Sequence, residues 1–137
     1  MNEQNNIAVI QQAFACFGQG DVPGILNTLS DDVHWWVAPV ENVPYTGTRS
    51  GKAGAAEFFS LLVQCEDTLQ FEPRDFIAQG DQVVVRGQYA ARAKETGREF
   101  TTYFIQMFTV REGKITSFEE YTDTAAIANA FVKTQTA

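Results

Sequence analysis

Two adjacent carboxylates near the end of the chain, Glu119 and Glu120, are the residues best placed for acid-base chemistry. They follow the turn at Gly113 in a stretch that predicts a strand, where successive side chains point to opposite faces of the sheet. Counting from Gly113 predicts that Glu120 faces inward and that Glu119 faces solvent, whereas a bulge between the turn and these residues would exchange the two assignments. An apolar surrounding would disfavour the charged form of Glu120 and raise its pKa toward the range useful for proton transfer.

Two interpretations of Glu120 stay open. In the first, Glu120 is catalytic and removes a proton next to a carbonyl, while Tyr103 donates a hydrogen bond to the developing oxyanion. In the second, Glu120 accepts hydrogen bonds from Tyr103, Arg86 or a residue of the pocket rim and only fixes the shape of the pocket. The remaining side chains that we expect to contact a ligand are Phe17, Trp35, Val37, Phe58, Leu62, Ile105, Met107, Phe118 and Thr122.

Other kinds of active site find little support. His34 is the single histidine, so no multi-histidine metal site is possible, and we expect neither a metal nor another cofactor. One histidine also leaves no specific Ser/His/Asp set, and neither a G-x-S-x-G motif nor a phosphate-binding glycine loop is present. Cys16 and Cys65 lack the short spacing of a redox or metal pair, so free buried thiols are predicted.

Composition restricts the class of protein further. The 137 residues fit one domain, 1–137, which is large enough to bury a core. A formal net charge of −7, with ten scattered Lys and Arg, argues against a nucleic-acid partner. No apolar run is long enough to span a membrane and the N-terminus does not resemble a secretory signal, so we expect a cytoplasmic protein. Eleven phenylalanines predict a core or cavity walled by aromatic rings.

Apolar residues at three- and four-residue steps predict three helices in the first half of the chain. The first spans residues 3–17, the second runs from about 22 to 29, and the third from 51 to about 64. The apolar run 33–37 between the second and third helices predicts a strand, in which Trp35 faces inward and Trp36 outward. Pro39, Pro44 and Gly47 mark a following loop that could form a rim or lid.

Everything after the third helix predicts strands until a final helix capped by Asp123 or Thr124. Residues 68–79 shift their apolar parity near Pro73, which implies a bulge. A strand through residues 83–92 has one apolar face, whereas the strand 100–110 is apolar on both faces and is expected to be central and covered on both. The plan is α+β, with helices packed on one side of a strongly curved sheet.

This order resembles the nuclear-transport-factor-2-like (NTF2-like) superfamily, and within it the proteins related to the polyketide cyclase SnoaL and to ketosteroid isomerase. The similarity covers nearly the whole chain and depends mostly on turns, caps and packing residues. These are Gly20-Asp21, Ser30-Asp31-Asp32-Val33 with Trp35, Gly47 with Gly51, Gly80-Asp81-Gln82-Val83, Thr96-Gly97-Arg98, and Gly113-Lys114-Ile115 with Glu120-Tyr121-Thr122-Asp123.

The resemblance implies an NTF2-like cone, in which a strongly curved mixed or antiparallel sheet and three N-terminal helices enclose a pocket, followed by a short C-terminal helix. It also implies a homodimer through the outer sheet surface. Family activities include double-bond isomerisation, polyketide ring closure, epoxide opening and dehydration.

The catalytic groups of two family branches have no counterpart in this sequence. The base, the tyrosine and the protonated aspartate of ketosteroid isomerase correspond to Val37 or Ala38, to Ala13 or Phe14, and to Ile105. The Arg-x-Asp pair of the fold's epoxide hydrolases does not occur. SnoaL-type cyclases use an Asp on the final strand, and Glu120 falls at or beside that position.

Two functional hypotheses follow. The first is a cofactor-free enzyme of the SnoaL-like group, which performs isomerase, cyclase or lyase chemistry on a small apolar carbonyl or ring compound through Glu120. The second is a non-catalytic module that binds an apolar metabolite or a protein partner.

Overall fold

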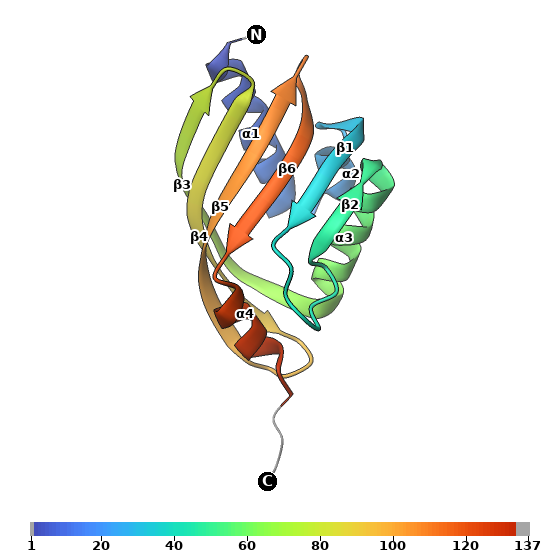
Figure 1. The fold of residues 1–137 in the computed structure, drawn as a ribbon, viewed down its shortest axis with the longest axis vertical. Helices are drawn as coiled ribbons and strands as arrows, with labels where there is room; N and C mark the ends of the chain where they lie inside the picture. The colour runs from blue at the N-terminus through green and yellow to red at the C-terminus, as the bar shows by residue number, and fades with distance from the viewer. Residues whose placement is uncertain (1, 134–137) are drawn as a thin grey trace.

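The computed structural model describes residues 2–133 as an α+β structure with a six-stranded sheet, which confirms the predicted fold class (Figure 1). Side-chain caps begin three of the helices: Asn2 accepts from the Asn5 N–H, Asp21 from Gly24, and Asp123 from Ala126. In chain order the elements are α1 (Glu3–Gly18), α2 (Val22–Leu26), β1 (Leu29–Val37), β2 (Gly47–Ser50), α3 (Gly51–Cys65), β3 (Glu66–Gln79), β4 (Gln82–Ala93), β5 (Glu99–Arg111), β6 (Lys114–Thr122) and α4 (Thr124–Phe131).

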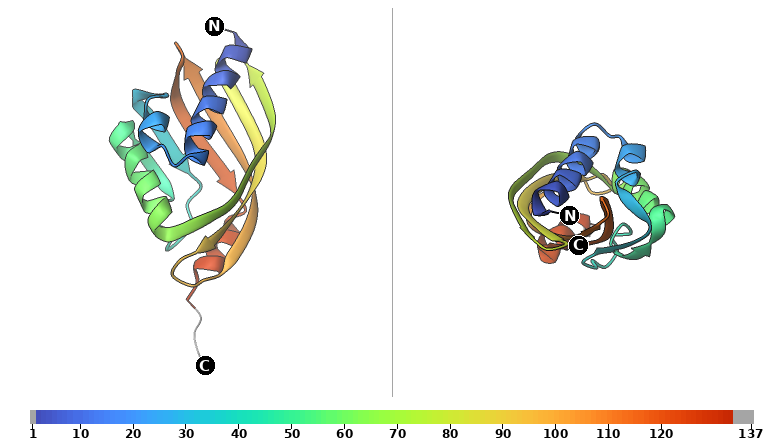
Figure 2. Two further views of the ribbon diagram at one scale, coloured as in Figure 1. Left: turned by 180° about the vertical axis from the view of Figure 1, so that it is seen from behind. Right: turned by 90° about the horizontal axis from the view of Figure 1, so that it is seen from above.

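The sheet is mixed and its strands lie in the order β2-β1-β6-β5-β4-β3. Strand β1 pairs with β6 in parallel, and every other neighbouring pair is antiparallel. Figure 2 shows the sheet curving around α1, α2 and α3, which all lie on its concave side. Helix α4 lies instead at the far end, against β5 and β4. The three N-terminal helices therefore cover the hollow of the sheet, as predicted.

The predicted bulge in the third strand is present, and it allows a close aromatic contact. The register of β3 against β4 shifts between Pro73 and Asp75. A side chain at Gly87 would lie 2.3 Å from the Glu72 carbonyl oxygen and 2.6 Å from the Phe104 ring. Glycine at this position leaves room for Phe104, whose ring stacks on Phe71 with a centroid distance of 5.1 Å.

Several element boundaries differ from those predicted. Helix α2 ends at Leu26 and β1 already begins at Leu29, because Asn27 and Thr28 form the turn that follows the helix. The loop after β1 contains the short strand β2, which has too few residues to show a period. Strand β3 begins at Glu66, directly after α3, two residues earlier than predicted.

The expectation that β5 is covered on both faces is wrong for a single chain. Phe104 and Phe108 are buried on the inner face, but Tyr103 on the outer face is 61% exposed. Ile105 and Met107 on the same outer face are only half-buried. Strand β5 is nevertheless central, since it pairs with β4 and β6. Among the described helices, none is long and apolar enough to cross a bilayer.

Candidate active site

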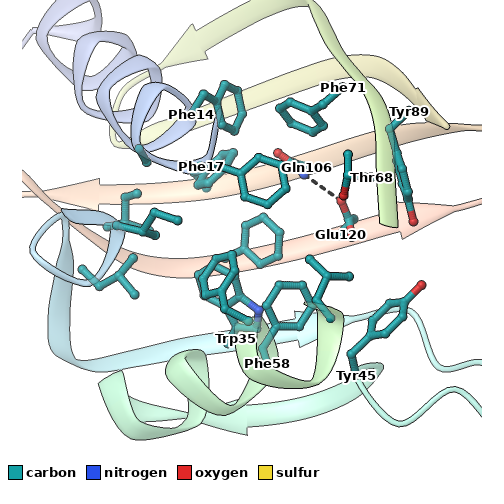
Figure 3. Close-up of a pocket in the computed structure, with 18 of the residues that line it drawn as sticks. Phe14, Phe17, Trp35, Tyr45, Phe58, Thr68, Phe71, Tyr89, Gln106 and Glu120 are labelled. Atoms are coloured by element: carbon teal, nitrogen blue, oxygen red, sulfur yellow. Dashed lines mark hydrogen bonds between the residues drawn. The ribbon is translucent and has the colours of Figure 1, made fainter. Parts of the chain in front are cut away.

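A cavity of about 90 Å³ lies between the concave face of the sheet and the three N-terminal helices (Figure 3). Its wall is mostly aromatic and aliphatic, and five of the residues predicted to contact a ligand form part of it. These five are Phe17, Trp35, Phe58, Leu62 and Phe118. Among the lining residues none is Lys, Arg or His, so the described part of the chain brings no cationic side chain to the wall.

Glu120 lies on this wall and faces inward as predicted, although a register shift of β6 against β5 between Ile115 and Ser117 interrupts the alternation from the turn. It stands opposite Gln106 in the β5–β6 register and is only 8% exposed, whereas its neighbour Glu119 stands opposite the outward-facing Met107. The Gln106 amide Nε2 donates a hydrogen bond to Glu120 Oε2 over 2.6 Å. Burial raises the pKa of Glu120 to about 7, although the bond from Gln106 acts in the opposite direction.

Tyr103 does not reach this pocket, and the prediction that it assists Glu120 is wrong. Side chains alternate along β5, so the inner face that carries Gln106 excludes Tyr103, Ile105 and Met107. These three belong to the outer face, and none of them lines the cavity. No hydrogen bond joins Arg86 to Glu120 either, because Arg86 pairs with Asp75 over 2.6 Å.

Val37 and Thr122 are also outside the cavity wall, for a different reason. Both share the inner face with Glu120: Val37 stands opposite Glu120 in the β1–β6 register, and Thr122 lies two residues further along β6. The cavity ends at Glu120, so Val37 packs in the core and is only 2% exposed, while Thr122 lies beyond the lining residues.

A second buried carboxylate, Glu66, lines the same cavity and was not predicted. It is 3% exposed, and the hydroxyl of Tyr45 donates a hydrogen bond to its Oε1 over 2.7 Å. Burial raises the pKa of Glu66 to about 7; the bond from Tyr45 lowers it, and the nearby charge of Glu120 raises it. The cavity therefore holds two carboxyl groups whose pKa values lie near neutral pH.

Tyr45 and Tyr89 complete the polar side of the wall. Burial raises the pKa of both phenols well above the usual value, and each hydroxyl influences the pKa of the other. Figure 3 shows Tyr89 beside Glu120 and Tyr45 across from it. Both phenols therefore stay protonated at neutral pH and remain hydrogen-bond donors next to the two carboxyl groups.

Glu66 was missed because a register shift reverses the apparent parity of its strand. Counting back in twos from the inward-facing Phe71 predicts that Leu69 and Asp67 face inward. The register of β3 shifts between Thr68 and Gln70, so Thr68 and Glu66 face the cavity instead, and Leu69 is 47% exposed. Tyr45 lies in a loop, where no period indicates direction. The carboxylate at the start of β3 was the only available signal.

We predict that Tyr45→Phe destabilises the protein by about 1–3 kcal/mol at pH 8, because it leaves the buried Glu66 carboxylate without its donor. The pKa of Glu66 is expected to rise further, so the loss shrinks at pH 5, where the carboxyl group is protonated. Urea unfolding at the two pH values measures this. Tyr103→Phe is the matched control, since its exposed hydroxyl should contribute less than about 0.5 kcal/mol. Equal losses in the two variants would contradict the role of Tyr45.

The cavity shares part of its wall with a groove on the outside of the molecule. Eight residues line both hollows, among them Phe14 and Phe17 of α1, Leu62 of α3, and Glu66 and Phe71 of β3. The groove therefore runs between α1, α3 and the start of β3.

The remaining predictions about the site concern cysteines and metals. Cys16 and Cys65 are both free and half-buried. Within residues 2–133, no three His, Cys, Asp or Glu side chains are grouped so that they could hold a metal ion. The expectation of a metal-free, cofactor-free site stays a prediction.

Comparison with known proteins shows where this architecture recurs. The profile of the SnoaL-like domain matches residues 10–118. An NTF2-like protein from Burkholderia xenovorans is 36% identical, with a TM-score of 0.88, over 96% of this chain and 99% of that chain. An NTF2-like protein from Burkholderia pseudomallei is 25% identical, with a TM-score of 0.87 and the same coverage. A search of curated proteins finds no match.

One similar structure was solved with a small molecule. TerC, co-crystallized with polyporic acid, is 33% identical to this chain. The match covers 92% of this chain and 97% of TerC, with a TM-score of 0.84.

Proposed function

The chain belongs to the SnoaL-like domain family of NTF2-like proteins, and from this premise we propose that it is a cofactor-free acid-base enzyme. It acts on a small, largely apolar carbonyl or ring compound by isomerase, cyclase or lyase chemistry. One observation carries the proposal: a buried carboxyl group with a pKa of about 7, Glu120, on the wall of an aromatic cavity.

Glu120 is the proposed catalytic residue. In its ionised form it removes a proton from the carbon next to the carbonyl, and the electron pair of that C–H bond forms an enolate. The proton then returns to another carbon of the enolate and gives the isomer. For ring closure, the enolate carbon attacks a second carbonyl carbon of the same molecule, the π bond of that carbonyl breaks, and its oxygen takes the proton from Glu120. A carboxyl group with a pKa near 7 is present in both forms at neutral pH, so it can take a proton and give it back.

The proposed ligand contacts are Phe17, Trp35, Phe58, Leu62 and Phe118, which present apolar ring faces to the cavity. The similarity to TerC supports a small organic molecule as the ligand, since that relative was co-crystallized with polyporic acid. Glu66, bonded to Tyr45, holds a second exchangeable proton on the same wall. A homodimer through the outer sheet face stays a prediction.

Solvent deuterium tests the proposal without a known substrate. The protein is incubated in D₂O with an extract of small apolar metabolites, and the extract is then compared by mass spectrometry with a protein-free control. We expect a carbonyl compound that gains deuterium or is converted to an isomer, because Glu120 exchanges its proton with solvent between turnovers.

Native mass spectrometry of the same mixture identifies the retained compounds. A compound that binds but leaves unlabelled and unchanged would contradict the enzymatic proposal. The protein would then be the non-catalytic binding module that is the alternative interpretation of the sequence.

A further inference from the structure

Two buried polar atoms of the cavity wall have no hydrogen-bond partner among residues 2–133. They are Trp35 Nε1 and Gln106 Oε1, and their side chains are 4% and 5% exposed. The other buried polar side-chain atoms without a partner in this part of the chain belong to Asn6, Ser30 and Thr122, none of which lines the cavity. Leaving a buried donor or acceptor without a partner is unfavourable, so a ligand that pairs with these atoms binds more tightly than one that does not.

The two atoms are held in fixed directions. The Trp35 indole stacks on Phe118 with a centroid distance of 4.1 Å and packs edgewise against Phe59. The Gln106 amide is anchored through its Nε2, which donates to Glu120, and this bond turns Oε1 away from the carboxylate. Figure 3 shows the two side chains reaching into the cavity from β1 and β5. The cavity therefore presents one N–H donor and one carbonyl acceptor in defined positions.

The charge of the wall restricts the ligand further. Glu66 and Glu120 both face the cavity, and no cationic side chain does among the described lining residues. An anionic ligand would be repelled by these carboxyl groups and would lose its hydration without compensation. A neutral ligand avoids that cost, and the aromatic wall favours a flat ring.

We infer that the cavity binds a neutral aromatic or enone ring compound that carries both a carbonyl and a hydroxyl group. The Trp35 Nε1–H donates to the ligand carbonyl, and the ligand hydroxyl donates to Gln106 Oε1. The inference takes the location of the ligand from the proposed function, but it concerns recognition and not turnover. Trp35 takes over the role of carbonyl donor that Tyr103 cannot fill.

Four single-ring probes of one shape separate the two contacts. 4-Hydroxyacetophenone carries both groups, acetophenone and 4-methoxyacetophenone lack the hydroxyl donor, and 4-ethylphenol lacks the carbonyl. Titrations at pH 6 keep the phenols neutral. We expect 4-hydroxyacetophenone to bind about three- to tenfold more tightly than each of the other three, since one hydrogen bond is lost in every case.

The indole N–H signals of the ¹⁵N-labelled protein report on the first contact directly. The chain has two tryptophans, and Trp36 packs against Tyr121 on the other face, so its signal is an internal control. We expect ketone probes to move the Trp35 signal downfield and to leave the Trp36 signal in place. 4-Ethylphenol should not produce the downfield movement. Trp35→Phe should remove the preference for the ketones, whereas Trp36→Phe should keep it.

Gln106→Met tests the second contact. This variant should abolish the advantage of 4-hydroxyacetophenone over acetophenone and retain the downfield movement of the Trp35 signal; circular dichroism checks the fold of each variant. The inference is overturned if no ketone moves the Trp35 signal, or if 4-ethylphenol moves it equally. It is also overturned if the affinity ratios are unchanged in Trp35→Phe and Gln106→Met. Such results would leave the proton transfer by Glu120 standing, because the deuterium experiment tests that step by itself.

Discussion

Glu120→Gln is expected to lower the rate of proton transfer by about 100- to 10,000-fold. The substitution keeps the size of the side chain and its oxygen, so the bond from the Gln106 amide can persist. It removes only the ability to accept and return a proton. The measurement is the rate of deuterium uptake or isomer formation for a compound found in the extract experiment, followed by NMR or mass spectrometry.

Glu119→Gln is the matched control for this experiment. Glu119 is the next residue on the same strand and bears the same chemical group, but it lies on the opposite face beside Met107. Its substitution should leave the rate within about twofold of the wild type. A Glu120→Gln protein that retains full activity would refute the catalytic role of Glu120, and equal losses in both variants would indicate a general effect on the fold.

Glu120→Gln should also stabilise the protein at alkaline pH, by about 3 kcal/mol at pH 8. Burial raises the pKa of Glu120 from 4.5 to about 7, so the unfolded chain releases this proton at lower pH than the folded protein does. Between pH 4.5 and 7 the folded state binds more protons, and the free energy of unfolding therefore falls as the pH rises. Below pH 4.5 the group is protonated in both states and the penalty is absent.

Urea unfolding at pH 4, 6 and 8 measures this difference. The stabilities of the wild type and of Glu120→Gln should be similar at pH 4 and should diverge toward pH 8. Glu66→Gln should also stabilise the protein toward pH 8. Its stabilisation should be smaller, because this variant loses the charge-assisted hydrogen bond from Tyr45. The free energy of unfolding of Glu119→Gln should change with pH in the same way as that of the wild type. A constant difference between Glu120→Gln and the wild type at all three pH values would show that Glu120 carries no burial penalty.

Turns, caps and the period of apolar residues were sufficient to predict the architecture. Asp123 begins the last helix as its capping side chain predicted, and the register shift near Pro73 occurs where the apolar parity changes. Each of these signals is local, because it depends on residues within one turn or one strand. The predicted inward direction of Trp35 agrees with the structure, because the alternation is unbroken through residues 33–37. Glu120 also faces inward as predicted, but the register of β6 against β5 shifts between Ile115 and Ser117, so a count in twos from the inward-facing Ile115 would have led to Glu119.

The polar half of the site could not be predicted in this way. Glu66 is directed inward by a register shift at Thr68 that leaves no mark in the apolar pattern, and Tyr45 is directed inward by a loop. Tyr103 was assigned to the pocket because it shares a strand face with Ile105, which corresponds to the protonated aspartate of ketosteroid isomerase. Strand β5 is apolar on both faces, so its own pattern did not identify the inner one. The hydrogen-bonding partner Gln106 identifies that face, but a glutamine in a strand is predicted to be exposed.

The parallel pairing of β1 with β6 has a consequence for how the protein acquires its site. The backbone oxygen of Glu120 accepts from the Ala38 N–H over 2.9 Å, so the last strand is fixed against the first. Such distant pairing must follow the closure of a long loop, which is a slow step in folding. The ribosome must therefore release every residue from β1 through β6 before Glu120 can be enclosed, and until then the aromatic rings that will surround it are open to water and to chaperones.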